Sequence, residues 1–332
     1  MMETVLPIDV VITWVDGQDS QLNQKRQKYL NTLIAKEAAS QTRFASNNEI
    51  YFCIASILKY MPEVGTIYLI TDQQKPLWLD EFVSQGLCSA GKIKIIDHMQ
   101  LFKGYEEYLP TFNSLSIETM FWNIPELAEH FIYFNDDFFL NAPLSGSDCF
   151  EQDKVIIYGH WKSNGLIKAK YSVRKALSRW SGQELQPKFT VAQMLSAEMA
   201  GLNQYYELHH RPHFIKKKIV QEYFSQHQDT LKHQISFRFR HIEQFLPVGL
   251  ANHLSIQKQQ AVLKADVDVA YIKPKADVKK FIEELKNTAI QYGCVQSFDM
   301  MDDVDQAMIY QALVEKFENF LPDQIKDQMN AV

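Results

Sequence analysis

Acidic residues stand directly after short apolar runs at three places in the first half of the sequence. Asp16 follows IDVVITWV, Asp72 follows TIYLIT, and the pair Asp136 and Asp137 follows FIYFN. Grouped carboxylates can hold a divalent cation, but Asp after a strand is also common in turns. For Asp72 alone a turn is the more frequent outcome, whereas the run from Asn135 to Asp137 favours a metal site.

The second half of the sequence carries basic residues that complement these acids. Residues 154–188 hold eight Lys and Arg against one Glu, and residues 208–241 hold seven Lys and Arg, two acids and six of the ten histidines. Arg, Lys and His bind the phosphate oxygens whose charge redistributes during phosphoryl transfer. A phosphoryl-transfer site requires both carboxylates and basic side chains, and the two halves of this sequence supply them.

Several of these candidates also have an ordinary structural interpretation. Glu49 stands in the first turn of an expected helix, where a carboxylate complements the helix dipole. His210 and His213 precede another expected helix and can either cap it or present imidazoles to an anion. Arg238 and Arg240 share one face if their segment is extended, and a solvated strand is the alternative there.

The basic segment 154–188 interleaves cations with the aromatic residues Trp161, Tyr171 and Trp180. Such a segment is often only a solvated surface. It also suits a polyanionic glycan, an anionic membrane or single-stranded nucleic acid. The sequence leaves these alternatives open.

The elements that must position these residues alternate between strand and helix. Apolar runs predict strands at 8–15, 66–71, 93–97 and 131–134. Helical spacing predicts helices at 19–38, 48–60, 114–129, 213–226, 276–290 and 304–319. This order predicts an α/β fold with a mainly parallel sheet and helices on both faces, in which ligands bind at the carboxyl ends of the strands.

Composition excludes several classes of protein. The 332 residues are 46% hydrophobic and 22% charged, which excludes disordered and fibrous proteins. A net charge of −6 argues against a general nucleic-acid binder. The four cysteines are widely spaced, the amino terminus lacks a basic signal region, and no run approaches the roughly 18 apolar residues of a membrane span. We expect a cytoplasmic protein, with a peripheral position at the inner face of the cytoplasmic membrane left open.

Four ordered blocks of the sequence resemble the Stealth family of sugar-phosphate transferases. IDVVITWVDG (8–17) and the blocks at 43–79, 109–118 and 130–140 are similar to its first two conserved regions. HHRPHF (209–214) with FRFRHIE (237–243) resembles the third, and GCVQSFDMMDD (293–303) is a weaker likeness to the fourth. Because the blocks are several and in order, a chance match is far less plausible than for any one of them.

The resemblance implies a Rossmann-like fold similar to GT-A glycosyltransferases, here with a helical basic insertion. It divides the chain into a nucleotide-sugar-binding half at 1–141, a basic, partly helical insertion at 142–205 on the acceptor or membrane side, and a half at 206–332 that bears His and Arg. It further implies transfer of a hexose-1-phosphate from a UDP-sugar to a sugar hydroxyl of a capsule or cell-surface polysaccharide, with release of UMP. A divalent cation, Mg²⁺ or Mn²⁺, is expected, with other capsule-assembly proteins as further partners and no nucleic acid.

Residues of this chain that match the family motifs receive roles from the resemblance. The catalytic group comprises Glu49, Asp72, His210 and Arg240, and the metal ligands are Asp136 and Asp137. The substrate-binding group comprises Asp16, Gly17, Arg43, Asn113, Asn135, His213 and Arg238. Two alternatives are a metal-dependent GT-A-type glycosyltransferase that releases UDP, and a non-catalytic subunit of a polysaccharide assembly complex.

Overall fold

A five-stranded sheet forms the centre of the molecule. The computed structural model describes residues 7–30, 47–181, 185 and 188–327, so Arg43 lies outside the described residues. The sheet order is β10-β4-β1-β2-β3, comprising β1 (Ile8–Thr13), β2 (Ile67–Thr71), β3 (Ile93–Asp97), β4 (His130–Asn135) and β10 (His213–Lys216). The first four strands are parallel to one another, and β10 pairs antiparallel with β4. The predicted α/β fold with a mainly parallel sheet is confirmed.

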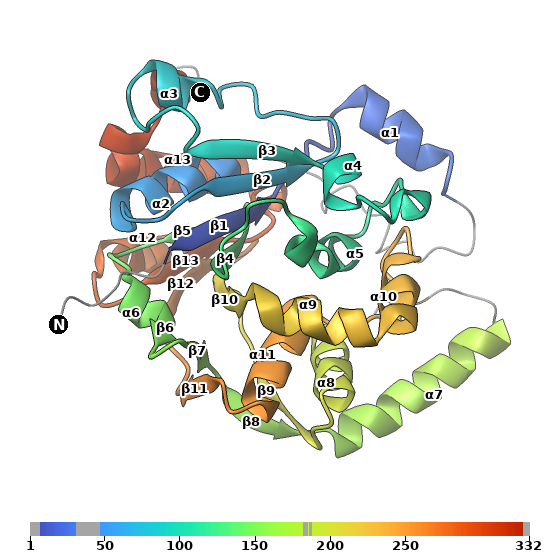
Figure 1. Cartoon of the computed structure of the whole chain (residues 1–332). Helices are drawn as coiled ribbons and strands as arrows, with labels where there is room; N and C mark the ends of the chain where they lie inside the picture. The colour runs from blue at the N-terminus through green and yellow to red at the C-terminus, as the bar shows by residue number, and fades with distance from the viewer. Residues whose placement is uncertain (1–6, 31–46, 182–184, 186–187, 328–332) are drawn as a thin grey trace.

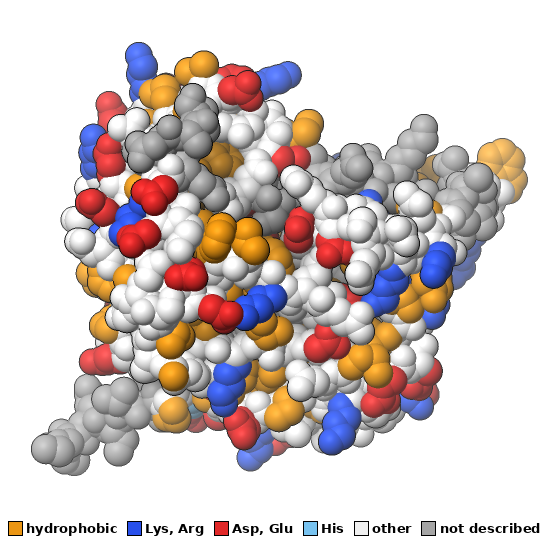
Figure 2. All heavy atoms as spheres, turned by 90° about the horizontal axis from the view of Figure 1, so that it is seen from above, with side chains coloured by type: hydrophobic (Ala, Val, Ile, Leu, Met, Phe, Trp, Pro, Cys, Tyr) orange, Lys and Arg blue, Asp and Glu red, His pale blue; other side chains and the backbone are white. Residues whose placement is uncertain are grey.

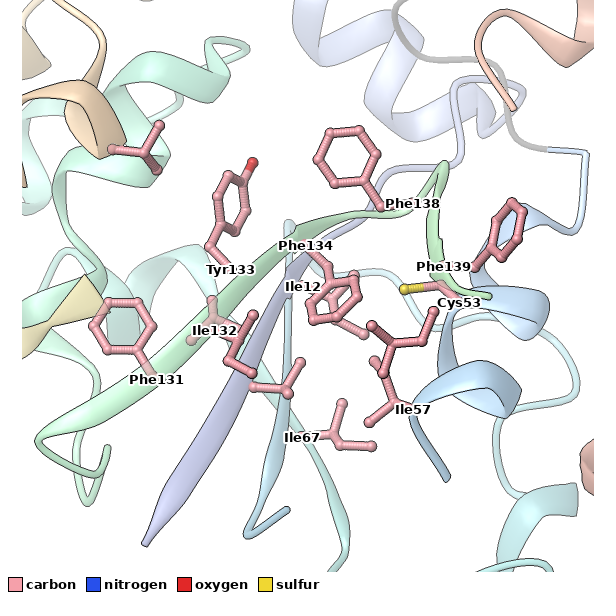
Figure 3. Packing of buried hydrophobic residues seen from close by; sticks show 14 of the residues in the cluster. Ile12, Cys53, Ile57, Ile67, Phe131, Ile132, Tyr133, Phe134, Phe138 and Phe139 are labelled. Carbon is pink, nitrogen blue, oxygen red and sulfur yellow. The ribbon is translucent and has the colours of Figure 1, made fainter. Parts of the chain in front are cut away.

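Helix α2 (Glu49–Tyr60) covers one face of this sheet. Every residue from Ile50 to Leu58 is buried, so this helix is apolar nearly all round and is held by packing on several sides. Figure 3 shows Cys53 and Ile57 of α2 beside Ile12 and Phe134 of the central strands. This packing fixes the start of α2 against the ends of β1 and β4.

Smaller sheets extend the central one. β5 (Phe138–Leu140) follows β4 after a two-residue turn and joins a sheet of order β12-β13-β5, with β12 (Val269–Ile272) and β13 (Tyr292–Val295). A third sheet contains β6 (Phe150–Glu151), β7 (Lys154–Tyr158) and β11 (Ala261–Lys264), and the fourth pairs β8 (His160–Ser163) with β9 (Gln204–Glu207). Two strand pairs connect the three segments predicted from sequence. β5 of segment 1–141 pairs with β13 of segment 206–332, and β7 of segment 142–205 pairs with β11 of segment 206–332.

The remaining helices surround these sheets (Figure 1). They are α1 (Ser20–Gln27), α3 (Glu81–Ser84), α4 (His98–Leu101), α5 (Ser114–Thr119), α6 (Gly146–Cys149), α7 (Gly165–Ser181), α8 (Phe189–Met199), α9 (Lys217–Gln226), α10 (Gln228–Ile235), α11 (Pro247–Gln257), α12 (Val278–Lys286), α13 (Asp303–Phe317) and α14 (Asp323–Asp327). Short 3₁₀ turns occur at Glu106–Tyr108, Phe121–Asn123, Phe298–Met300 and Glu318–Phe320. None of the helices in the described part of the chain combines the length and apolarity of a membrane span.

Three of the predicted helices are wrong in extent. The helix expected at 114–129 ends at Thr119 and gives way to a 3₁₀ turn, and Pro125 just beyond cannot donate the backbone hydrogen bond that would continue it. The helix expected from residue 213 begins at Lys217, because His213–Lys216 instead pairs with β4 as a sheet strand. The helix expected over 19–38 ends at Gln27, and its predicted residues 31–38 lie outside the described part.

Candidate active site

Three carboxylates from two elements line one hollow at the carboxyl edge of the central sheet. Asp136 and Asp137 form the turn that leaves β4, and Glu49 is the first residue of α2. We call this group the acidic pocket, whose walls also include Phe52, Phe138, Phe139, Val295, Phe298 and Leu313. Hydrophobic walls around three acids make the ionised forms costly.

Burial raises the pKa values of all three acids, and repulsion from neighbouring carboxylates adds to the rise for Glu49 and Asp136. Burial raises the pKa of Glu49 to about 7, and Asp137 and Asp299 add repulsion to it. Burial likewise raises the pKa of Asp137 to about 6. The pKa of Asp136 lies well above its usual range, first through burial and then through Asp137 and Glu49. Such perturbed carboxylates in a hollow are typical of functional sites.

The acidic pocket has the donor set of a divalent-cation site. The Cys294 thiol donates to one carboxylate oxygen of Asp137 at 3.6 Å. The other oxygen, Oδ1, is buried and has no hydrogen-bond partner among the described residues. Hard cations such as Mg²⁺ prefer carboxylate oxygens, and a cation would relieve the repulsion that raises these pKa values. The residues present therefore fit Mg²⁺ or Mn²⁺.

Glu49 contacts the amino end of its own helix and also lines the acidic pocket. Its carboxylate accepts a hydrogen bond from the backbone N–H of Asn47 at 2.5 Å, at the amino end of α2. It therefore supports its own helix terminus, as the dipole argument expects. It also faces Asp136 and Asp137 across the acidic pocket. The sequence alone could not show this second relationship.

A second polar group surrounds Arg240. Its Nη2 donates to the Ser114 hydroxyl at 2.6 Å. The buried Glu118 has a pKa raised to about 7 by burial, an effect opposed by the charge of Arg240 and by hydrogen bonding with Ser114 and Tyr133. We call Ser114, Glu118, Tyr133 and Arg240 the arginine cluster.

The arginine cluster adjoins the acidic pocket through β4. The Tyr133 hydroxyl donates to the side-chain oxygen of Asn135 at 2.5 Å and is 3.1 Å from the Thr13 hydroxyl. Burial raises the pKa of Tyr133 well above its usual range, with Glu118 and Asp136 adding to the shift. The charges of Arg240 and Asp136 therefore both act on the Tyr133 hydroxyl.

Asn113 positions this cluster from inside the protein. Its side chain is fully buried, caps α5 by accepting from the backbone N–H of Leu115, and donates to the carbonyl of Phe237 and to Gln244. Those contacts use both amide hydrogens and engage the amide oxygen, so Asn113 positions its neighbours, and its contact with substrate stays a prediction. Asn113 ties the helix that carries Ser114 to the loop that carries Arg240.

The two predicted histidines lie in different environments. The exposed ring of His210 is stacked with Phe189 at 5.4 Å and with Tyr271 at 6.0 Å between ring centroids. The charge of Asp137 contributes to the raised pKa of Tyr271. Stacking on Tyr271 therefore brings His210 close to the acidic pocket. His213 is buried in β10 opposite Tyr133, and burial lowers its pKa well below the usual range, followed by repulsion from Arg211 and His210. Burial also lowers the pKa of His210, so both rings are favoured in the neutral form.

Arg238 does not share a strand face with Arg240. The segment around it is a bend rather than a strand, so the condition for a shared face fails. The guanidinium of Arg238 lies 4.8 Å from the centre of the Tyr29 ring and bonds the carbonyl of Leu109. Between the two arginines, Phe239 stacks on Phe112 and holds the bend to the protein.

Asp72, Asp16 and Gly17 lie at the same sheet edge but have other partners. Asp72 accepts two hydrogen bonds from Lys25 of α1, at 2.8 and 2.7 Å. Because β1 separates β2 from β4, Asp72 is about 10 Å from the end of β4 by strand spacing. The backbone of Asp16 forms two hydrogen bonds with the side chain of Gln74, and the carbonyl of Gly17 accepts from Asn23. Their roles in catalysis or substrate binding stay predictions.

A further group of potential metal ligands lies apart from the acidic pocket. Ligand atoms of His160, Glu207 and His209 lie within 4.8 Å of one another on and beside β8 and β9. These residues already have polar partners, since both histidines contact Asp266 and Lys162 contacts Glu207. The described part of the chain therefore offers two places for a cation, and only the acidic pocket has a buried oxygen without a partner.

Sequence reasoning did not single out several residues of the site. Tyr271, Cys294 and Asp299 lie against the acidic pocket, and Glu118 and Tyr133 belong to the arginine cluster. Four of them fall inside the blocks that carry the family resemblance, which is the signal that could have identified them. Tyr271 lies outside those blocks, and only the β12-β13-β5 sheet places it near Asp137.

The fold and the site together define an α/β protein whose candidate active site stands at the carboxyl ends of parallel strands. Two family models match the chain: Stealth protein conserved region 1 over residues 6–34 and Stealth protein conserved region 2 over residues 43–157. An exopolysaccharide phosphotransferase of Lactiplantibacillus plantarum, cps2G, is 30% identical over 250 residues, which cover 70% of this chain and 71% of that protein. The chain belongs to the Stealth family.

Other relatives are longer than this chain. The capsular polysaccharide phosphotransferase fcs1 of Haemophilus influenzae is 34% identical over 72% of this chain and 62% of its own length. The enzyme cps12A of Actinobacillus pleuropneumoniae, with the same kind of name, is 42% identical over 52% of this chain and 45% of its own length. The chain thus spans roughly half to three fifths of these two relatives.

Solved structures show a distant likeness. The superposition on the galactosyltransferase LgtC covers 96% of this chain and 99% of the LgtC chain, with a TM-score of 0.41 and 10% sequence identity. The bifunctional glycosyltransferase WbbM covers 99% of this chain and 52% of its own, with a TM-score of 0.47 and 10% identity. The fold class rests on the strand order described above rather than on these scores.

Proposed function

We propose that this protein transfers a hexose-1-phosphate from a UDP-sugar to a sugar hydroxyl of a capsule or cell-surface polysaccharide, forming a phosphodiester and releasing UMP. One observation carries the proposal: a carboxylate pocket suited to a cation adjoins a partly buried arginine at the carboxyl edge of the sheet. The names of the relatives, capsular and exopolysaccharide phosphotransferases, support this class of reaction.

In the proposed reaction the acceptor oxygen forms a bond to the β-phosphorus of the donor. The bond from that phosphorus to the oxygen of UMP breaks, and the hydroxyl proton passes to a base. Mg²⁺ or Mn²⁺ held by Asp136 and Asp137 would neutralise charge on the pyrophosphate. Every other role falls to side chains of this chain.

Arg240 is the proposed ligand of the transferred phosphoryl group. One of its nitrogens bonds Ser114, and the fork of a guanidinium offers further donors that suit phosphate oxygens. The charge of Glu118 acts on the Arg240 guanidinium and favours its charged form. His210 is proposed as a second phosphate or hydroxyl contact from the opposite side of the pocket.

Glu49 is the best candidate for the base. A base works best when its pKa lies near the working pH, and that of Glu49 is raised to about 7. His210 is the alternative base, because its lowered pKa favours a neutral imidazole that can accept a proton. Asp16, Gly17 and Asn135 are proposed to line the donor pocket along the same sheet edge.

The test is to identify the nucleotide product. The protein is incubated with a UDP-hexosamine, Mg²⁺ and an oligosaccharide acceptor, and the nucleotides are separated by chromatography. UMP together with a phosphodiester signal in phosphorus NMR supports the proposal. UDP would indicate glycosyl transfer instead, and turnover unchanged in Arg240→Ala and His210→Ala would indicate that these residues are not the site.

A further inference from the structure

Helix α7 presents an apolar stripe to the solvent. Leu166, Val173, Leu177 and Trp180 are 79%, 60%, 56% and 88% exposed, respectively. Their spacing of seven, four and three residues places them on one side of a helix, since each residue advances by 100°. By helical rise the stripe is about 21 Å long. Apolar side chains gathered in this way, unlike scattered ones, mark an interaction surface.

The same helix is strongly basic. Its 17 residues contain Lys168, Lys170, Arg174, Lys175 and Arg179 and no Asp or Glu. On the helical wheel Lys170 and Arg174 flank one side of the stripe, whereas Lys168, Lys175 and Arg179 lie on the opposite side of the helix. The stripe is therefore bordered by positive charge along one side.

The opposite side of α7 attaches it to the rest of the protein. Ile167 and Tyr171 pack against the cluster formed by Val191, Met194, Ala197 and Tyr205. Lys168 pairs with Glu198 at 2.7 Å, and Lys175 pairs with Glu243 at 2.7 Å. Figure 1 shows α7 along the margin of the molecule, with one end extending beyond the neighbouring helices. The attachment fixes which face of α7 points outward.

We propose that α7 docks this protein on an anionic lipid surface. Leu and Trp on one face of a helix with Lys and Arg beside them form the pattern of helices that lie in the membrane interface. Trp suits the boundary between acyl chains and headgroups, and each nearby cation gains from anionic lipid.

The positive charge of α7 favours an anionic lipid surface over a second copy of this chain. A second copy of the same face would bring two basic helices together and is disfavoured by their repulsion. On the face of the molecule drawn in Figure 2, basic and acidic side chains are interspersed. The inference does not depend on the proposed reaction, since it needs no turnover to be tested.

The experiment is co-sedimentation of the full chain with vesicles. Vesicles of equal parts phosphatidylglycerol and phosphatidylcholine are compared with vesicles of phosphatidylcholine alone, at low and high salt. The expected result is binding to the anionic vesicles that weakens with salt and falls at least tenfold in the double variant Leu177→Glu, Trp180→Glu. Because both side chains are exposed, the variant should keep the melting temperature of the parent.

Matched controls use exposed apolar residues elsewhere. Leu77→Glu, in the loop after β2, and Val304→Glu, at the start of α13, introduce the same charge and should leave vesicle binding within twofold of the parent. Equal loss in the controls, equal binding to both kinds of vesicle, or no loss in the α7 variant would overturn the proposal. If the α7 variant instead abolishes a dimer seen by light scattering without lipid, the stripe is a protein interface and the proposal is also wrong.

Discussion

The ring of His210 lies parallel to the ring of Tyr271, with 10° between their planes and 6.0 Å between their centroids. His210 belongs to the loop before β10, and Tyr271 belongs to β12, which reaches the acidic pocket through β13 and β5. The stacking therefore joins the histidine segment to the carboxylates. It makes Tyr271 a positioning residue for His210.

This relationship predicts different effects for two substitutions of Tyr271. Tyr271→Ala removes the stacked ring, and we expect transfer activity to fall about tenfold or more through misplacement of His210. Tyr271→Phe keeps the ring and should retain most activity. Steady-state kinetics with thermal melting of both variants checks this. Equal activity of the two variants would show that the stacking does not position His210.

Cation binding should weaken as the pH falls. The acidic pocket must be ionised to bind a cation, and the pKa values of Glu49 and Asp137 are raised to about 7 and about 6. We expect the affinity for Mn²⁺ to decrease by up to about tenfold per pH unit below pH 7 for each proton displaced. Titration calorimetry between pH 5.5 and 8 measures this. An affinity independent of pH would contradict a site at these carboxylates.

Without a cation, stability should decrease as the pH rises. The folded-state pKa of Glu49 is raised to about 7, above the ordinary carboxyl value near 4, so the folded state binds this proton more tightly. The resulting stability is complete below about pH 4 and is lost as the pH approaches 7. At pH 8 in chelator, Glu49→Gln should be more stable than the parent by roughly 1 to 3 kcal/mol.

Urea unfolding at pH 5 and pH 8 measures the free energy of unfolding for this comparison. The two proteins should differ less at pH 5, where Glu49 is mostly protonated. Asp229→Asn, in the first turn of α10 and outside the acidic pocket, is the matched control and should not show the pattern. A parent protein that is more stable at pH 8 than Glu49→Gln would contradict the raised pKa.

Arg240 and Glu118 should be coupled in stability. Arg240→Ala leaves the buried Glu118 without the cation that opposes the rise of its pKa, and we expect a loss of about 2 to 4 kcal/mol. Adding Glu118→Gln should recover part of this loss, because the unpaired charge is gone. The double-mutant cycle measures the coupling. The single variant Arg240→Ala and the double variant should both lack transfer activity, although the double variant recovers stability. This difference separates the role of Arg240 in stability from its proposed role in binding phosphate.

Much of the fold was predictable from local sequence patterns. Buried strands such as Ile8–Thr13 and Ile67–Thr71 are largely apolar runs, and their alternation with helices predicts a parallel sheet with acids at its carboxyl edge. The ends of elements were less predictable. Residues 213–216 form a strand because β4 offers them a pairing edge, which no local pattern of those residues shows.

The sequence by itself determined which side chains stand at the ends of the strands, because strand order in the chain and apolar periodicity are local properties. Only the tertiary structure decided which of them act together. Asp72 and Asp136 occupy equivalent strand ends, yet β1 separates their strands, and Lys25 pairs with the first while Glu49 joins the second. Asn113, Tyr271 and Cys294 acquired their roles through contacts with residues far away in the chain. Burial and proximity of charges set the pKa values of the site, and both are properties of the packed molecule.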